Sequence, residues 1–319
     1  MDWWIIVAIV FGFIVLSFGV GAVIMLKKTV PIAKYVYHDQ LVKTDPEKWG
    51  RVCSCPENEE QLAMWEQGLV WGEQHKEQKT DLHIVHDGLN LYGEFYRLND
   101  SNKCVFIIPG RCESLLYSYY FAPPYEAAGY NVMMVDARAH GLSDGTHNTV
   151  GVKESGDLLA WLKLAVDELG MEEIYFHTIC IGTATALLAM THPDCPTQVK
   201  GLVTEGCFTS FAETFKQHMI QMKRPIFPVM QLAMREIKKN TGTDVYKSAP
   251  IRAMKKVHQR VLFLYGKQDV FSIPPKSKEL FAACASKDKT LVWFDKGSHS
   301  HLRLNNQEQY DAAIIDFLN

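Results

Sequence analysis

The fold is decided by residues 175–187, "YFHTICIGTATAL". The apolar run at 175–179 is typical of a strand, and an Ala-rich, helix-favouring segment follows at once. A sharp strand-to-helix turn of this kind, with a small residue two positions after its tip, is typical of a nucleophile elbow. Gly182 supplies the small residue, and the tip is Cys180, where a serine is usual. The sequence therefore raises the question whether Cys180 is a nucleophile or a buried structural thiol.

Further short apolar runs indicate a sheet that is buried on both faces. They cover residues 103–110, 130–138, 199–206, 259–269 and 289–297, and helical patterns lie between or after them at 151–169, 181–192, 275–286 and 305–318. Residues 81–98 split at Asp87-Gly88 into two β-rich runs, which is a strong hairpin signal. Because strands and helices alternate, we predict an α/β fold with a mostly parallel central sheet, helices on both faces and an antiparallel hairpin at one edge.

The composition favours one globular domain and excludes several classes of function. The chain has 319 residues, of which 47% are hydrophobic and 22% charged, with a net charge of -3. This charge gives no electrostatic reason to expect a nucleic acid partner. The eight cysteines have no paired spacing, and Cys53 and Cys55 lack a second Cys/His pair at a zinc spacing. From these spacings we expect no disulfide framework and no metal. The sequence also contains no phosphate-binding or GxGxxG loop, so we expect no cofactor.

The N-terminal segment predicts a membrane anchor. Residues 3–26 carry no charge, and about 20 apolar residues are enough for a helix to cross the hydrocarbon layer. A cleaved signal peptide is the lesser alternative, because Asp2 stands where a basic stretch is usual and no convincing cleavage site follows. Lys27, Lys28 and Lys34 follow the span, so the positive-inside tendency places the rest of the protein in the cytoplasm. We divide the chain into an anchor at 1–28, a connector at 29–64 and a catalytic domain at 65–319.

Reactive side chains gather where the predicted strands end, which is the edge at which open α/β sheets bind ligands. Cys180, Asp269 and His299 each follow such a strand, in that order. A nucleophile, then an acid, then a histidine is the chain order of the α/β-hydrolase triad. With "DARAHGLSDG" at 136–145, "VLFLYGKQD" at 261–269 and "KGSHS" at 296–300, the chain resembles the α/β-hydrolase superfamily from about Leu82 to Leu318. It is most similar to the membrane-anchored bacterial branch of serine-aminopeptidase-like and esterase-like proteins.

The resemblance implies a role for each of these residues. Cys180 would be the nucleophile, at a helix N-terminus that favours the thiolate. His299 would be the base, and Asp269 the acid that orients it. His301 is the alternative base, and Glu205, which ends the preceding strand, is the alternative acid.

The turn around the nucleophile departs from the family pattern in two places. Thr178 stands where the family usually has Gly, and its β-branched side chain is expected to crowd the turn. Pro109-Gly110 replaces a usual His-Gly pair, which preserves the loop. By the resemblance, the oxyanion hole would use the backbone N–H groups of Ile181 and Arg111. The Arg111 side chain is either a solvated charge or a group that holds a substrate carboxylate.

Residues 208–250 interrupt the strand-helix alternation and predict a lid of two helices, broken near Pro225 and Pro228. The methionines of this lid offer an adaptable apolar lining suited to acyl chains: Met219, Met222, Met230 and Met234. The alternative is that these side chains only pack the lid onto the body. The segment is also basic, so we expect it to meet the anionic surface of the membrane.

The chemistry of a cysteine nucleophile shapes the predicted function. A thioester is attacked by amines and thiols, relative to water, more readily than an oxygen ester is. We predict hydrolysis of an ester, thioester or amide of a small or lipid-like acyl compound through an acyl-Cys180 intermediate, with acyl transfer as the alternative. Another hypothesis is a membrane-tethered pseudoenzyme or ligand-binding protein, since Thr178, Pro109 and Cys180 each depart from the family pattern.

Overall fold

The computed structural model describes residues 2–41, 59–111 and 113–319. Cys53, Cys55 and Cys112 therefore lie outside the described residues. The chain divides into two compact units. The smaller contains Met1–Gln40 and Lys216–Asp244, and the larger contains Leu41–Phe215 and Val245–Asn319.

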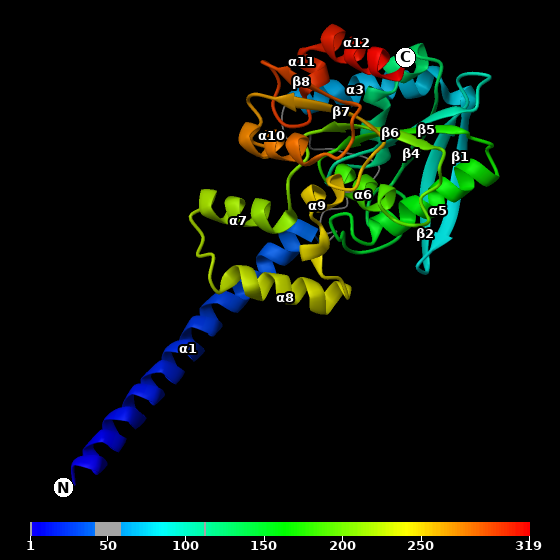
Figure 1. Cartoon of the computed structure of the whole chain (residues 1–319). Coiled ribbons are helices and arrows are strands. Elements are labelled where there is room, and N and C mark those ends of the chain that lie inside the picture. The colour runs from blue at the N-terminus through cyan, green and yellow to red at the C-terminus, as the bar shows by residue number, and fades with distance from the viewer. Residues whose placement is uncertain (1, 42–58, 112) are drawn as a thin grey trace. The chain divides into compact units, whose positions relative to one another are not determined.

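The larger unit is built on a sheet of eight strands among the described residues (Figure 1). The strands lie in the order β1-β2-β4-β3-β5-β6-β7-β8. β1 (Lys79–His86) and β2 (Leu89–Tyr96) form an antiparallel hairpin, and Asp87 and Gly88 in its turn have positive φ values of 52° and 73°. β2 also pairs antiparallel with β4, and the remaining pairs are parallel. The predicted α/β fold, with its mostly parallel sheet and edge hairpin, is confirmed.

The parallel strands carry apolar side chains on both faces of the sheet. In β3, Phe106 and Ile108 belong to one core layer and Val105 and Ile107 to the other, because successive side chains of a strand alternate. This explains why the sequence shows continuous apolar runs rather than alternation. The strands are β3 (Lys103–Ile108), β4 (Asn131–Val135), β5 (Glu173–Ile179), β6 (Val199–Glu205), β7 (Arg260–Gly266) and β8 (Lys289–Phe294).

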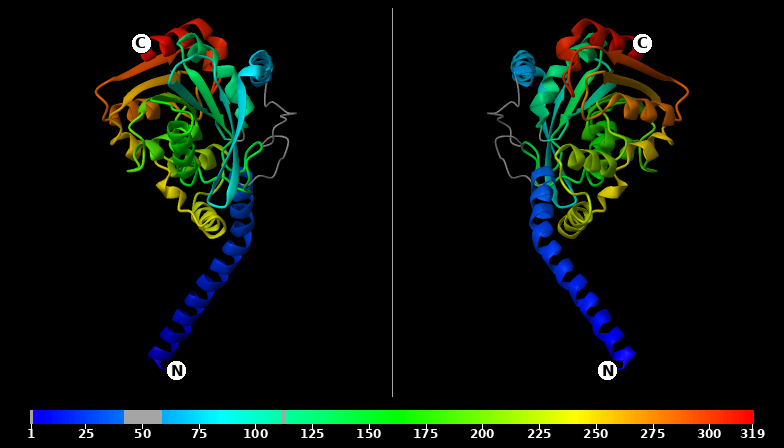
Figure 2. Two further views of the ribbon diagram at one scale, coloured as in Figure 1. Left: turned by 90° about the vertical axis from the view of Figure 1, so that its right-hand side faces the viewer. Right: turned by 90° about the vertical axis from the view of Figure 1, so that its left-hand side faces the viewer.

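Helices cover both faces of this sheet, and Figure 2 shows the strands between them. One core layer contains side chains of α5 (Glu154–Asp167), α6 (Ile181–Met190), α9 (Pro250–Met254) and α10 (Pro274–Ala283). The other contains side chains of α3 (Glu59–Gln74), η2 (Leu115–Phe121), α4 (Pro123–Ala127), α11 (Leu302–Asn305) and α12 (Gln307–Leu318). Two further short helices are η1 (Lys76–Gln78) and η3 (Val245–Lys247). α3 begins within the span predicted as connector, since Met64 and Trp71 contribute to this core.

The smaller unit contains most of α1 (Trp3–Leu41) together with α8 (Val229–Thr241) and the end of α7 (Phe211–Gln221). Residues Trp3–Tyr35 form one helix that is long and apolar enough to cross a membrane, by length and composition. α1 continues past the predicted end of the anchor at residue 28. The two helices predicted for 208–250 are α7 and α8, and Pro225 and Pro228 lie between them.

Arg138, in the turn after β4, is a buried guanidinium that ties three segments together. Its Nε and Nη2 atoms donate to the carboxylate of Asp157 on α5 at 2.7 and 2.6 Å, and Nη1 donates to Asp87 of the hairpin turn at 3.1 Å. Arg138 is 3% exposed and Asp157 is 5% exposed. Because both charges have lost their hydration, each depends on the other for stabilisation.

Replacing Arg138 by Ala should therefore lower the free energy of unfolding by roughly 3–5 kcal/mol, because Asp157 is left as a buried charge without its main partner. Urea unfolding of the full-length protein, followed by tryptophan fluorescence, measures this. The matched control is Lys163→Ala, which removes an exposed ion pair with Asp167 on the same helix and should leave stability nearly unchanged. An equally small effect of both substitutions would contradict the role assigned to Arg138.

Candidate active site

The junction between β5 and α6 is a one-residue turn. β5 ends at Ile179, α6 begins at Ile181, and the Cys180 backbone between them has φ 52° and ψ -112°. An L-residue adopts such a conformation at a cost of about 1–3 kcal/mol. Two backbone hydrogen bonds hold the turn: Cys180 N–H donates to Glu205 O at 3.0 Å, and Thr183 N–H donates to Cys180 O at 3.2 Å. Strain persists only where the surrounding structure imposes it, so this outlier marks Cys180 as a candidate for function.

Gly182 allows the turn to be this tight. A Cβ atom on Gly182 would lie 2.5 Å from Ile108 O and 2.9 Å from Pro109 O, closer than backbone atoms tolerate. The first turn of α6 is therefore in direct backbone contact with the end of β3. Packing thus requires a residue without a side chain two positions after Cys180.

Thr178 fits the turn because its hydroxyl joins a chain of hydrogen bonds. The Thr178 side chain is buried, and its Oγ1 donates to Val203 O at 3.2 Å. The same oxygen lies 2.9 Å from Thr183 Oγ1, which lies 3.0 Å from Thr204 Oγ1. The three threonines thus link β5, α6 and β6, and the Thr178 side chain is accommodated in this hydrogen-bonded chain rather than crowding the turn.

Asp269, after β7, is held at hydrogen-bond distance from His299. Asp269 Oδ2 lies 2.7 Å from His299 Nδ1, while Oδ1 accepts the N–H groups of Phe271 at 2.8 Å and Ser272 at 2.7 Å. Burial alone would raise the pKa of Asp269, but the hydrogen bond and charge of His299 and the two N–H donors hold this pKa below its usual value. The carboxylate is therefore ionised and has its orientation fixed, as the predicted role requires.

His299 carries a proton more readily than an ordinary histidine. Burial opposes its charge, but the electrostatic interaction with Cys180 and the hydrogen bond and charge of Asp269 outweigh burial and hold the pKa of His299 well above its usual value. Gly206 lies against the imidazole with φ 62°, and a Cβ there would lie 2.8 Å from His299 Cε1. The structure thus brings Cys180, His299 and Asp269 together, and their catalytic roles stay a prediction.

Glu205, the alternative acid, occupies a different position beside the three residues. Its Oε2 accepts the Tyr310 hydroxyl at 2.6 Å, and its Oε1 accepts Leu302 N–H at 3.2 Å. Burial raises the pKa of Glu205 to about 7, although these hydrogen bonds act against the shift. Among the described residues, the carboxylate that is hydrogen-bonded to His299 is that of Asp269. Glu205 instead supports the segment that follows His299.

His301, the alternative base, also has partners outside the predicted triad. Its Nδ1 lies 2.8 Å from Ser298 Oγ and 3.2 Å from Glu60 Oε2 on α3. Asn305 Nδ2 donates to the other oxygen of Glu60 at 2.8 Å. His301 therefore connects the loop that carries His299 to α3, and the geometry favours His299 as the base.

The predicted oxyanion hole lies at the start of α6 and in the loop after β3. Ile181 N–H is the first of α6, where unpaired N–H groups and the helix dipole favour negative charge. Beside Arg111, Gly110 N–H donates to Glu113 Oε2 at 2.7 Å, and a Cβ on Gly110 would lie 3.6 Å from Cys180 Cβ. Glu113 is thus a carboxylate close to the turn that the sequence analysis missed. In the sequence, the one hint of this contact is that Glu113 stands three residues after Gly110.

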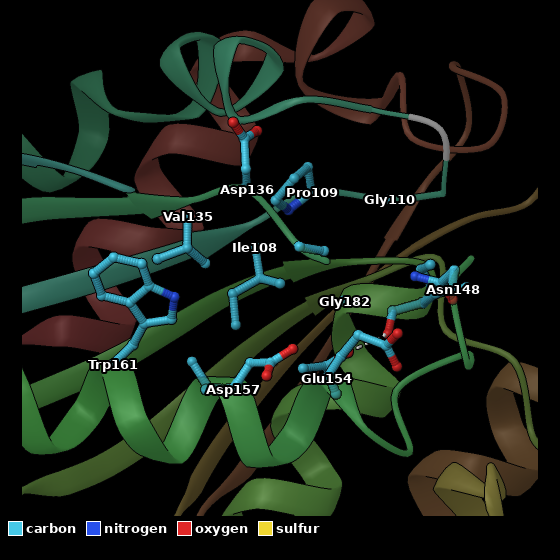
Figure 3. Close-up of a pocket in the computed structure, with 14 residues that line it drawn as sticks. Ile108, Pro109, Gly110, Val135, Asp136, Asn148, Glu154, Asp157, Trp161 and Gly182 are labelled. Atoms are coloured by element: carbon cyan, nitrogen blue, oxygen red, sulfur yellow. Dashed lines mark hydrogen bonds between the residues drawn. The ribbon is translucent and has the colours of Figure 1, made fainter. Parts of the chain in front are cut away.

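A small cavity lies beside this turn, among residues of β3, β4, α5 and α6 (Figure 3). Its volume is about 30 Å³, which suits one or two water molecules. Trp161 Nε1 and Asn148 Nδ2 are buried in its wall and have no hydrogen-bond partner among the described residues, and Figure 3 shows both facing the cavity. The carboxylates of Glu154 and Asp157 in the same wall already accept hydrogen bonds from the protein. The cavity therefore offers donors to a water molecule or a polar atom.

Cys207, shortly after β6, is buried and interacts electrostatically with Cys180, and burial, followed by this interaction, holds the pKa of its thiol well above the usual value. Burial raises the pKa of the Cys104 and Cys284 thiols, and that of Cys195 to about 11, which keeps these thiols protonated. Within residues 2–41, 59–111 and 113–319, no group of three or more His, Cys, Asp or Glu side chains is arranged to hold a metal ion. The four lid methionines belong to the smaller unit, where Met222 is exposed and three are buried: Met219, Met230 and Met234.

The charge contact between Cys180 and His299 predicts a measurable shift. Replacing Cys180 by Ala removes the largest influence that raises the pKa of His299, so the titration of this imidazole should move to lower pH. NMR of the His299 Cε1–H signal as a function of pH measures the midpoint. Asp269→Asn should lower the midpoint as well, whereas His258→Gln, at an exposed position, should not change it. A midpoint unchanged in Cys180→Ala would show that the two side chains do not interact.

Comparison with known proteins agrees with this fold. The family model described as alpha/beta hydrolase fold matches residues 103–237. The uncharacterized protein YqkD of Bacillus subtilis is 25% identical over 236 residues, which cover 72% of this chain and 76% of YqkD. The alpha/beta hydrolase domain-containing protein WAV2 of Arabidopsis thaliana is 28% identical over 200 residues, which cover 59% of this chain and 60% of WAV2.

A solved structure supplies the comparison in three dimensions. An esterase of Pyrococcus furiosus superposes with a TM-score of 0.63 at 20% identity and covers 77% of this chain and 92% of its own. This likeness concerns the fold, which is the same arrangement of strands and helices that carries the turn at Cys180. From its sheet, its family-model match and its likeness to this structure, the chain has the α/β-hydrolase fold.

Proposed function

We propose that this protein hydrolyses an ester, thioester or amide of an acyl compound through a thioester on Cys180. The observation that carries the proposal is the strained turn at Cys180, next to a His299 whose proton is stabilised by Cys180 and Asp269 together. A thiolate beside an imidazolium is the reactive form of a cysteine nucleophile. The α/β-hydrolase fold, which the chain shares with an esterase, supports hydrolase chemistry in general.

The proposed reaction has two halves, with His299 moving the proton in each. The Cys180 sulfur, having given its proton to His299, attacks the substrate carbonyl carbon and forms a C–S bond. The bond to the leaving group then breaks, and the leaving group takes the proton from His299. A water molecule next gives a proton to His299 and attacks the thioester, which releases the acid and returns Cys180. Asp269 keeps the imidazole oriented throughout.

The oxyanion that forms in each half needs N–H donors close to Cys180. In the proposal these are Ile181 N–H and Arg111 N–H. The loop that carries Arg111 is held in part by Glu113, whose carboxylate accepts the neighbouring Gly110 N–H.

Acyl transfer is the second candidate, and the identity of the nucleophile favours it. A thioester on Cys180 discriminates against water relative to amines and thiols more than an ester on serine does. The same intermediate would then pass its acyl group to an amine or thiol acceptor. Adding such an acceptor to the assay and identifying the products distinguishes transfer from hydrolysis.

The turnover of acyl esters and thioesters by variants of the full-length protein tests the proposal. Cys180→Ala should reduce kcat by at least about 1,000-fold, because the covalent route is lost. Cys195→Ala is the matched control, since this half-buried free cysteine lies away from the turn, and its kcat should be unchanged. Turnover by Cys180→Ala at the wild-type rate would refute a Cys180 nucleophile. Absence of turnover in the wild type would favour a pseudoenzyme, and higher turnover by Cys180→Ser would favour an altered serine enzyme.

The location of the protein is part of the proposal. α1 would span the membrane once, and the lysines that follow the span would hold the larger unit in the cytoplasm. Alkaline phosphatase fused to the C-terminus in a bacterial host tests this, because the fused enzyme is active only outside the cytoplasm. We expect an inactive fusion, and an active one would reverse the proposed topology. Asp2→Lys combined with Lys27→Asp and Lys28→Asp should shift the fusion towards activity.

A further inference from the structure

A strongly basic segment occupies residues 216–240 of the smaller unit. It contains six basic residues and one acidic residue, Glu236, a net charge of +5, whereas the whole chain carries -3. None of the six forms an ion pair with another described residue. Arg224 is half-buried, and the other five are exposed: Lys216, Lys223, Arg235, Lys238 and Lys239. The positive charge of the segment is therefore uncompensated within the smaller unit.

Apolar side chains lie between these charges on the surface. Ile220 is 56% exposed, one helical turn after Lys216 and three residues before Lys223. Phe227, between α7 and α8, is 70% exposed, and Met222 is 46% exposed. Basic and apolar side chains that share a helix surface are typical of segments that bind at a membrane interface.

α8 separates its buried and its charged side chains. Its buried positions recur at helical spacing, as do the basic residues opposite them at 235, 238 and 239. The buried set is Val229, Met230, Ala233, Met234, Ile237 and Thr241. One face of α8 is thus committed to the interior of the protein, and the other presents three positive charges to the exterior.

The basic segment belongs to the same compact unit as the apolar part of α1. Within this unit, α8 lies beside α1 in both views (Figures 1 and 2), and the Arg224 guanidinium lies 5.4 Å from the ring centroid of Tyr35. All residues of α1 from 3 to 28 are exposed, and the first buried one is Thr29, directly after Lys27 and Lys28. The protein therefore begins to cover α1 where the apolar span ends.

The dimensions agree with this arrangement. Residues 3–26 extend about 36 Å as a helix, slightly more than the hydrocarbon core of about 30 Å. Tyr35 lies about 12 Å beyond Lys27 along the helix axis, and the headgroup layer accounts for about 5–7 Å of that distance. The long side chains of Lys and Arg, together with the exposed Phe227 side chain, reach across much of the remaining distance to the headgroups.

We propose that residues 216–240 form a surface that binds the anionic lipid headgroups of the membrane crossed by α1. The partner is the bilayer surface itself, recognised by positive charge and by shallow insertion of Ile220, Met222 and Phe227. The inference rests on the membrane anchoring proposed above and is independent of the proposed catalysis. Each basic residue near an anionic bilayer strengthens such binding, and salt weakens it.

Hydrogen exchange of the full-length protein in lipid nanodiscs tests this surface. Phosphatidylcholine nanodiscs provide the neutral reference, and nanodiscs that also contain phosphatidylserine provide the anionic surface. Amides of 216–240 should exchange about tenfold more slowly in the anionic discs, and high salt should remove the difference. Lys216→Glu with Lys223→Glu should abolish it. Lys255→Glu with Lys256→Glu, which reverses two exposed charges on the larger unit, is the matched control and should retain it.

Three outcomes would overturn the proposal. Equal exchange in both kinds of nanodisc would show that the anionic lipid is not recognised. Slow exchange in both, and also in detergent, would show that another part of the protein or a second copy covers the segment. An equal loss of protection in the control variant would show that net charge acts and not this surface. If the protein failed to enter nanodiscs at all, the membrane anchor would be refuted together with this surface. A lack of turnover would refute the proposed catalysis alone, because the exchange experiment does not depend on activity.

Discussion

The close contact between the start of α6 and the end of β3 is the constraint on which the candidate site depends. Because Gly182 has no side chain, α6 approaches to within contact of the Ile108 and Pro109 carbonyls. At the junction that makes this approach, the Cys180 backbone has a positive φ of 52°. The same turn places the Cys180 side chain beside His299 and leaves Ile181 N–H at a helix N-terminus. A threonine chain beneath it, linking β5, α6 and β6, holds the strained backbone in place.

Charges then determine what this turn can do. Asp269 is buried yet ionised because His299 and two N–H groups stabilise its carboxylate. His299 is buried yet holds its proton because Cys180 and Asp269 stabilise its positive charge. Glu205 lies nearby with a pKa of about 7 and supports the backbone after His299. Glu113 lies close to the same turn, where its carboxylate accepts Gly110 N–H.

The sequence sufficed for the features that follow from periodic apolar patterns. The strands, the hairpin at Asp87-Gly88 and the order of the residues at the strand ends were all predictable, because burial on both faces leaves continuous apolar runs. Local side-chain geometry was not predictable in this way. The crowding expected at Thr178 disappears because Thr183 and Thr204 come from segments far apart in sequence, and Glu113 reaches Gly110 through a loop conformation with no sequence signature. The association of α1 with residues 216–244 likewise depends on tertiary contacts that no periodicity reports.

The most direct test of the central claim is to trap an acyl group and identify the atom that carries it. The full-length protein is mixed with an activated acyl thioester, quenched in acid within the first turnover, and digested for mass spectrometry. The structure predicts an acyl adduct on the peptide that contains Cys180. Once the thiol has been acylated, this adduct should persist longer in His299→Ala. An adduct on another cysteine, or labelling of Cys180→Ala to the wild-type extent, would contradict a nucleophile placed by this turn.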